Sequence, residues 1–192
     1  MLLSTKKVRR GKEACMKKTI RGFTLIELLI SVAIIGLLAA MFVPNALTAI
    51  HKSKQKSTMR DMRTIGVAIA DYVTDNGSAP AQEGIYDGSS AFYNAVSPFY
   101  VKTLPLNDKW GTGYRVWCGS AAAEYGISDA LGDDFLVASF GRDKAQESFV
   151  FDEGSFGAGL FQVASISDFD KDLIMWNGIW IRYPRVGSRS GS

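Results

Sequence analysis

Histidine is almost absent from this 192-residue sequence, which contains only His51. This residue lies just beyond a long apolar run, so the folded part that follows has no Ser-His-Asp triad and no histidine zinc site. A dinucleotide-binding loop is also missing, because the stretch GTGYRV has Val116 at the position of the third glycine. Acidic residues are plentiful, and a hydrolase that uses carboxylates alone is therefore the alternative enzymatic interpretation.

Charge is absent from residues 23–43, apart from the single carboxylate of Glu27. As a helix rising about 1.5 Å per residue, this run reaches roughly 31 Å, which matches the core of a bilayer. An ordinary secretory signal is shorter, with about 7 to 15 apolar residues. A buried helix of a large soluble enzyme is the alternative, but the run follows a strongly basic flank. The sequence therefore predicts one membrane-spanning helix.

The positive charge of the chain is concentrated in residues 1–22. Eight basic residues there face one acid, Glu13, which gives a net charge of +7. The whole chain carries +3, so residues 23–192 carry 3 − 7 = −4. The basic flank is expected to stay in the cytoplasm. A basic nucleic-acid-binding domain loses its main support, and we expect no nucleic-acid partner.

The stretch GFTLIELL, residues 22–29, resembles the class III signal of type IV prepilins and type II secretion pseudopilins. The resemblance implies that a prepilin peptidase cuts between Gly22 and Phe23 and that the new N-terminus of Phe23 is methylated. It also implies that Glu27 is needed for filament assembly. Residues 1–22 would then be the leader, and Met16 is an alternative start because leaders in this family are often short.

This resemblance gives a physical reason for the acid in the apolar run. Cleavage leaves an ammonium group on Phe23 at a helix N-terminus, where a carboxylate one turn later is a favourable counter-charge. A lone acid in a bilayer costs about 2.5 to 3.5 kcal/mol, so a partner for Glu27 is expected. The chain's own amine or that of an adjacent subunit could be this partner. The alternative is that the carboxylate only reaches the lipid headgroups.

A second helical pattern follows the apolar run. Apolar side chains recur every three or four residues between 59 and 73, which predicts an amphipathic helix over residues 44–76. Pro44 predicts a kink or a locally melted segment, and Gly77 is a typical stop residue. The second helix therefore continues the hydrophobic one.

Residues 77–192 are expected to form one small globular domain. A short helix is predicted near residues 90–96, and short apolar stretches bounded by Gly or Asp predict strands. The expected strands are residues 114–118, 135–140, 149–151, 160–164 and 173–176. The predicted fold class is α+β and pilin-like, with a long N-terminal hydrophobic helix packed on a small antiparallel β-sheet.

Cysteine is scarce as well. Cys15 would leave with the leader, and Cys118 alone cannot form an intramolecular disulfide, whereas many type IV pilins have such a bond. The segments DKWGTGYRV, DDFLVASFGRDK and DFDKDLIMWNG resemble, in order, strand and turn segments of the major pseudopilin of type II secretion systems. Both observations favour a pseudopilin, and a subunit of a surface type IV pilus is the alternative.

The same resemblance implies a calcium site between the second and third of these segments. Its ligands would be the side chains of Asp143, Asp170 and Asp172 and the backbone carbonyls of Phe140 and Arg142, with Asp168 as an alternative. The insert 145–167 and the tail after Trp176 depart from the family pattern. A solvated acidic turn is the alternative interpretation.

The resemblance implies a structural protein, not an enzyme, that forms a helical filament of its own copies. Expected partners are the prepilin peptidase, the minor pseudopilins, the inner-membrane assembly platform of the secretion system and the membrane. The expected location is the inner membrane, with a single pass and the C-terminal domain in the periplasm.

The first prediction concerns processing. Gly22 has no side chain to obstruct a peptidase, and the basic leader holds the following bond at the cytoplasmic face. We expect the mature protein to begin at N-methyl-Phe23, as mass spectrometry of the N-terminal peptide would show. A mature chain that begins beyond Ala40 would contradict the prepilin interpretation.

Overall fold

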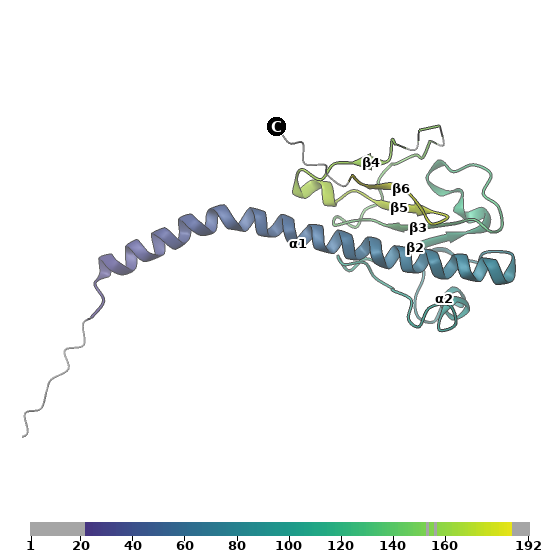
Figure 1. Ribbon diagram of the computed structural model, residues 1–192, viewed down its shortest axis with the longest axis horizontal. Helices are drawn as coiled ribbons and strands as arrows, with labels where there is room; N and C mark the ends of the chain where they lie inside the picture. Colours follow the sequence, from purple (N-terminus) through teal and green to yellow (C-terminus); the bar gives the residue numbers. More distant parts are fainter. Residues whose placement is uncertain (1–21, 153, 156, 186–192) are drawn as a thin grey trace, which may run out of the picture. The chain divides into compact units, whose positions relative to one another are not determined.

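The computed structural model describes residues 22–152, 154–155 and 157–185. The remainder of the leader, with the alternative start Met16, lies outside these residues. The chain divides into two compact units, residues 1–42 and 43–192. Helix α1, Leu25–Asn76, contributes to both units (Figure 1).

The first unit contains the apolar part of α1. Thr24 precedes the helix, and its hydroxyl accepts a hydrogen bond from the backbone N–H of Glu27 at 3.3 Å, as a helix N-cap does. The large apolar side chains of residues 25–43 are 49–89% exposed. In length and composition α1 is able to cross a membrane. An exposed apolar surface of this extent is typical of a segment that contacts lipid or another protein chain.

Pro44 does not interrupt α1. The backbone is helical on both sides of this residue, so the locally melted segment that the sequence allowed is not found. The helix ends at Asn76, and Gly77 follows with φ +74°, a conformation that glycine adopts without a steric penalty. The Gly77 N–H donates to the carbonyl of Val73 at 2.7 Å, which closes the last turn.

The second unit contains a six-stranded sheet with the order β1-β2-β3-β5-β6-β4. The strands are β1 Glu83–Ile85, β2 Arg115–Cys118, β3 Phe135–Ser139, β4 Leu160–Phe161, β5 Leu173–Trp176 and β6 Ile179–Pro184. All neighbours pair antiparallel except β4 and β6, which are parallel. The α+β arrangement of a long helix and a mostly antiparallel sheet is thus confirmed.

Individual strands differ from the prediction in three places. The strand expected at residues 149–151 is wrong, because these residues are not in a strand, and Phe149 and Phe151 instead pack against the sheet. Strands β1 and β6 were not predicted. β6 follows a tight turn at Asn177 and Gly178, which have φ +47° and +80°; Asn-Gly is the preferred pair for such a hairpin turn.

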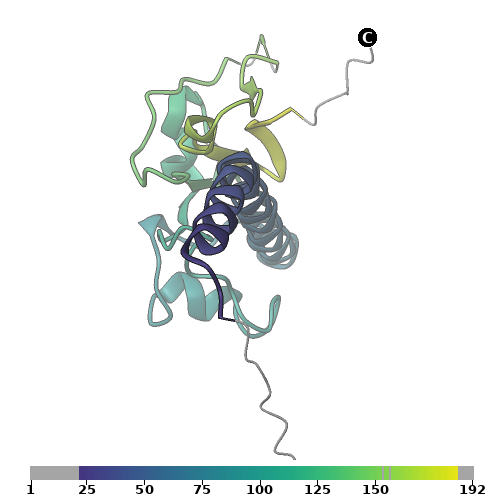
Figure 2. The same ribbon diagram turned by 90° about the vertical axis from the view of Figure 1, so that its left-hand side faces the viewer.

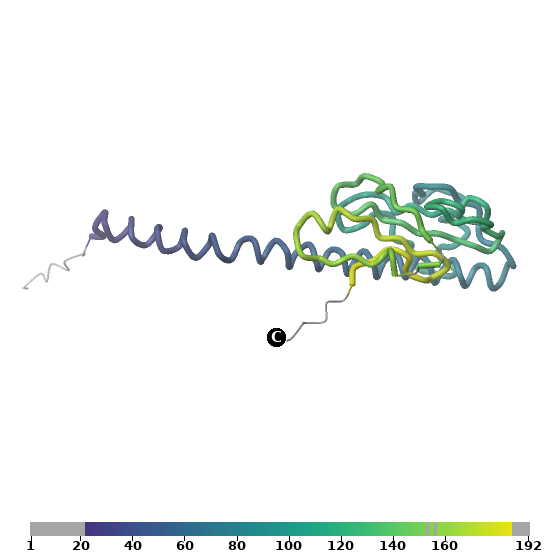
Figure 3. The backbone as a smooth tube through the Cα atoms, turned by 90° about the horizontal axis from the view of Figure 1, so that it is seen from above, coloured from purple at the N-terminus to yellow at the C-terminus, as the bar shows by residue number. Residues whose placement is uncertain are grey.

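The core of the second unit lies between α1 and one face of the sheet. Met62, Ile65 and Ile69 are fully buried there, at the three- and four-residue spacing of one helix face, and pack with Val137 and Met175 of the central strands. Helix α2, Ala91–Val96, lies on the side of α1 away from β5 and β6 (Figures 1 and 2). The strands and their loops lie along one side of the part of α1 that belongs to the second unit (Figure 3).

The opposite face of the sheet is also buried. All five residues of β3 are buried, because its alternate side chains enter two different clusters. The second cluster joins Leu136 and Ile174 to Tyr125 and Phe151, which lie in the connections that follow β2 and β3. These connections form a third layer over the sheet, and their position fixes the loops described below.

The second prediction tests the helix–sheet core. The change Ile65→Ala should lower the free energy of unfolding of residues 43–192 by about 2–5 kcal/mol, because it leaves a cavity at a fully buried position. The matched change Val67→Ala, at a residue that is 54% exposed on the same helix, should alter it by less than about 0.5 kcal/mol. Denaturant unfolding measures both, and equal effects would contradict the assigned helix face.

Candidate functional site

The predicted processing and assembly residues lie together at the start of α1. Gly22 and Phe23 precede the helix, Phe23 is 76% exposed, and a side chain built on Gly22 would meet no atom within 4 Å. The bond between them therefore lies in accessible, non-helical chain. Glu27 lies in the first turn of α1, where the backbone N–H groups provide positive potential. Its carboxylate makes no ion pair with any described residue.

The predicted calcium ligands lie on two segments that the sheet brings together. Ser139 at the end of β3 pairs with Leu173 at the start of β5. The loop after β3 and the loop before β5 therefore lie next to each other at the same end of these two strands. The Arg142 N–H donates to the carbonyl of Phe169 at 2.8 Å. A side chain at Gly141 would be 2.7 Å from that carbonyl oxygen, so only glycine fits between the two loops.

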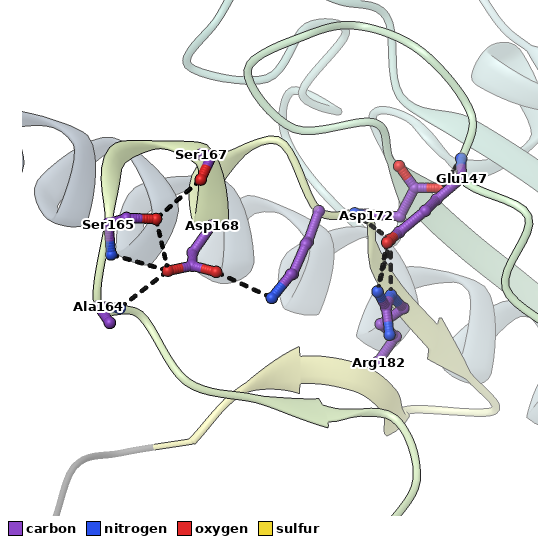
Figure 4. A network of polar contacts seen from close by, with 8 residues as sticks. Glu147, Ala164, Ser165, Ser167, Asp168, Asp172 and Arg182 are labelled. Carbon is purple, nitrogen blue, oxygen red and sulfur yellow. Dashed lines mark hydrogen bonds and ion pairs between the residues drawn. The ribbon is translucent and has the colours of Figure 1, made fainter.

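Asp168 stabilises its own loop. It accepts hydrogen bonds from the backbone N–H groups of Ala164 at 2.9 Å and Ser165 at 2.8 Å, and it forms an ion pair with Lys171 at 2.9 Å (Figure 4). The Lys171 ammonium and these N–H groups hold the pKa of the Asp168 carboxyl well below its usual range. These contacts cap the short 3₁₀ helix Ile166–Phe169, so both carboxylate oxygens already have partners.

Asp170 is also engaged. Both of its carboxylate oxygens accept hydrogen bonds from the Arg142 guanidinium, at 2.7 and 2.8 Å. A bidentate pair of this kind is the strong form of carboxylate recognition by arginine. Asp170 is therefore paired with Arg142, and both of its carboxylate oxygens are occupied by this contact rather than turned toward a metal position.

Asp172 is the buried acid of the loop. It is 0% exposed, and its Oδ2 accepts hydrogen bonds from the Glu147 N–H at 2.9 Å and the Tyr125 hydroxyl at 3.4 Å. Its Oδ1 has no hydrogen-bond partner within the described part of the chain. Burial raises the pKa of the Asp172 carboxyl to about 7, and the negative charges of Glu147 and Asp143 act in the same direction.

Glu147 is a residue that the sequence analysis missed. It lies in the insert after β3, and its carboxylate forms an ion pair with Arg182 of β6 at 2.6 Å (Figure 4). The same carboxylate accepts a hydrogen bond from the Asp172 N–H at 3.3 Å. No motif marks this residue, because its partners lie 25 and 35 positions away along the chain.

The predicted calcium ligands are thus brought near one another but not into a ready metal centre. A hollow of about 450 Å³ lies between the two loops and is lined by Asp143, Glu147, Asp168 and Asp170, among others. Across the described residues, no group of three or more His, Cys, Asp or Glu side chains is arranged to hold a metal ion. What fits a cation best is the unpartnered, buried Oδ1 of Asp172.

Comparison with known proteins identifies the relatives of this chain. Residues 17–43 match the family described as the prokaryotic N-terminal methylation motif. No solved structure matches. The type II secretion system core protein G of Pseudomonas aeruginosa is 34% identical over 101 residues, which are 49% of this chain and 70% of that protein.

Two further relatives have the same name. The protein of Klebsiella pneumoniae is 30% identical over 106 residues, which cover 50% of this chain and 73% of the relative. The protein of Escherichia coli K12 is 32% identical over 103 residues, which cover 49% and 69%. These matches span most of each relative, and the chain therefore belongs to the family of type II secretion system core protein G, the major pseudopilins.

Proposed function

We propose that this chain is a structural subunit that polymerises through its N-terminal helix into a pseudopilus of a type II secretion system. The family is one of structural proteins, not of enzymes. One observation carries the proposal: an apolar helix segment with exposed side chains directly follows the Gly22-Phe23 motif and contains a single acid. Such a segment can be buried by a bilayer before assembly and by other copies of itself afterwards.

The proposed assembly step is a charge pairing. After cleavage, the amine of Phe23 and the carboxylate of Glu27 have opposite charges at the start of the helix. In an apolar environment each needs a partner, and the amine of a neighbouring copy is a suitable one for Glu27. The names of the relatives favour a pseudopilus over a surface type IV pilus.

The partners and location follow from the same motif. The N-terminal hydrophobic helix and the methylation motif agree with anchoring in the inner membrane. The positive flank favours a cytoplasmic leader, and residues 43–192 would then lie in the periplasm. The proposed partners are a prepilin peptidase, the minor pseudopilins and the inner-membrane assembly platform.

Calcium is the proposed cofactor of the loops beside β3 and β5. Asp143 and Asp172 are the side chains that would hold it, with the backbone carbonyls of Phe140 and Arg142. Asp170 would join only after leaving the Arg142 guanidinium. The support for this proposal is the buried Oδ1 of Asp172, which has no hydrogen-bond partner among the described residues. A cation that prefers oxygen ligands, such as calcium, would offset the free-energy cost of burying the charged carboxylate. The ion would hold the two loops together.

The third prediction tests assembly. The change Glu27→Leu should leave membrane insertion intact, because it removes a charge from the apolar segment, but should lower the filament yield by tenfold or more. The reason is that a charged partner left alone in an apolar site costs about 3–5 kcal/mol. Filaments and membrane-bound protein are quantified by immunoblot and electron microscopy.

The control is Asp152→Leu, which removes an exposed acid from the connection between β3 and β4 of the second unit. It should leave the filament yield unchanged. Filaments of Glu27→Leu at the wild-type level would contradict the charge-pairing proposal.

The fourth prediction concerns calcium and pH. Burial raises the pKa of Asp172 to about 7, whereas in the unfolded chain it is near 4. The folded state then binds more protons between these values, so without calcium the free energy of unfolding should fall as the pH rises from about 4 to 7. Calcium at about 100 times its dissociation constant should restore roughly 2.7 kcal/mol at pH 8. Thermal unfolding of residues 43–192, in calcium and in chelator, measures both effects.

The variant for this test is Asp172→Asn, whose amide oxygen can keep the hydrogen bonds from Glu147 and Tyr125. In chelator at pH 8 it should unfold at a higher temperature than the wild type, and it should not respond to calcium. The control Asp71→Asn, at an exposed acid on α1, should respond like the wild type. Equal wild-type midpoints in calcium and chelator would remove the site.

A further inference from the structure

An apolar groove lies between α1 and the outer strands of the sheet in the second unit. Met59 of α1, Val163 after β4 and Trp180 of β6 form apolar parts of its walls, and its volume is about 360 Å³. Lys52 and Lys56 also line it; they are exposed and lie one helical turn apart, on the same side of α1. The groove thus combines an apolar interior with two positive charges.

A buried glutamine is also part of the lining of this groove. Gln55 lines it and is only 4% exposed, and its Nε2 has no hydrogen-bond partner among the described residues. An unpaired buried donor is unfavourable, and a carbonyl oxygen brought in by another chain would satisfy it. The groove therefore suits a segment that supplies an apolar side chain, a backbone carbonyl and negative charge.

One surface loop of this same chain has these properties. Leu131 is 65% exposed and stands between Asp129 and Asp133, which are also exposed. Two hydrogen bonds fix the conformation of this loop. Asp134 accepts one from the Leu131 N–H and one from the Asn177 side chain, each at 2.6 Å. It presents an apolar tip with an acid on each side.

The groove and this acidic loop, residues 128–134, lie at opposite ends of the second unit. The Ala79 N–H donates to the carbonyl of Gly132 at 2.9 Å, which places the loop beside the C-terminal end of α1. Gln55 lies 21 residues before Asn76, or about 32 Å along the helix axis. A subunit therefore cannot insert its own loop into its own groove.

The charge of α1 and of the segments beside its C-terminal end changes along the same axis. Residues 43–70 have five Lys or Arg residues and one acid, Asp61, whereas residues 71–87 and 119–134 together have eight acids and no Lys or Arg. Copies stacked head to tail would bring opposite charges together. Because the two surfaces differ, such a contact is heterologous, and it extends into a filament when the rotation between copies does not close a ring.

We propose that the groove of one subunit receives the acidic loop of the next copy of this chain, with Leu131 in the apolar groove and Asp129 and Asp133 facing Lys52 and Lys56. A carbonyl of the loop accepts the hydrogen bond that Gln55 Nε2 offers. This inference rests on the proposed function, to which it adds a second contact between the globular parts of adjacent subunits.

The test is a cross-link between two singly substituted full-length chains in assembled filaments. One chain has Lys56→Cys and the other Asp133→Cys, and a short bis-maleimide joins the two thiols. Cys118 is buried, and burial raises the pKa of its thiol to about 12, so it reacts little. We expect a dimer that requires both variants, and none from the matched pair Lys56→Cys with Lys102→Cys, an exposed lysine elsewhere.

Charge reversal provides an independent readout. Lys56→Asp or Asp133→Lys alone should lower the filament yield about tenfold, since an attraction between exposed charges becomes a repulsion. A chain with both changes should recover most of the yield, whereas Lys102→Asp should not recover that of Asp133→Lys.

The outcomes separate this inference from the proposed function. If the two cysteine variants form filaments at the wild-type level but give no 56–133 cross-link, the interface is overturned and the proposed function stays intact. The same holds if the chain with both charge reversals does not recover the filament yield. If Lys56→Asp lowers the filament yield but the 56–133 cross-link does not form, another partner fills the groove. This result also overturns the proposed interface. A wild-type chain that forms no filaments would contradict the proposed function, and with it this contact.

Discussion

The burial of one face of α1 against the sheet is the interaction on which residues 43–192 depend. Met62, Ile65 and Ile69 have no exposed surface, and the central strands of the sheet contact them through Val137 and Met175. Among the described residues of this unit, every other helix or strand is much shorter than α1. The edges of the sheet, the connections that cover its far face and the loops with functional interest all take their positions from this contact.

The same helix serves two environments. Its first residues expose apolar side chains on every side, and from Gln55 onward one face is buried in the protein core while basic residues occupy other faces. A continuous helix satisfies its backbone hydrogen bonds in both settings, which neither an extended segment nor a loop can do in lipid. One helical element is therefore suited both to the proposed membrane anchoring and to the support of a folded domain.

The acidic loops show how a cluster of carboxylates is sorted by folding. Asp168 caps a short helix, Asp170 pairs with Arg142, and Asp172 is buried beside Glu147 and Tyr125. Three acids at alternating positions thus have three different environments. Only the third combines burial of the whole side chain with a carboxylate oxygen that has no hydrogen-bond partner among the described residues.

The sequence by itself determined the apolar segment, the processing motif and the α+β class. These depend on local properties: the length of an apolar run, the neighbours of Glu27 and the spacing of Ile65 and Ile69 on one helix face. Tertiary structure alone decided that β6 joins the sheet and that Glu147 of the insert meets Arg182. It also decided that Asp172 rather than Asp170 keeps one carboxylate oxygen without a hydrogen-bond partner among the described residues. The physical reason is that the state of a carboxylate depends on the groups that fold against it, and here those groups lie 25 or more residues away in the chain.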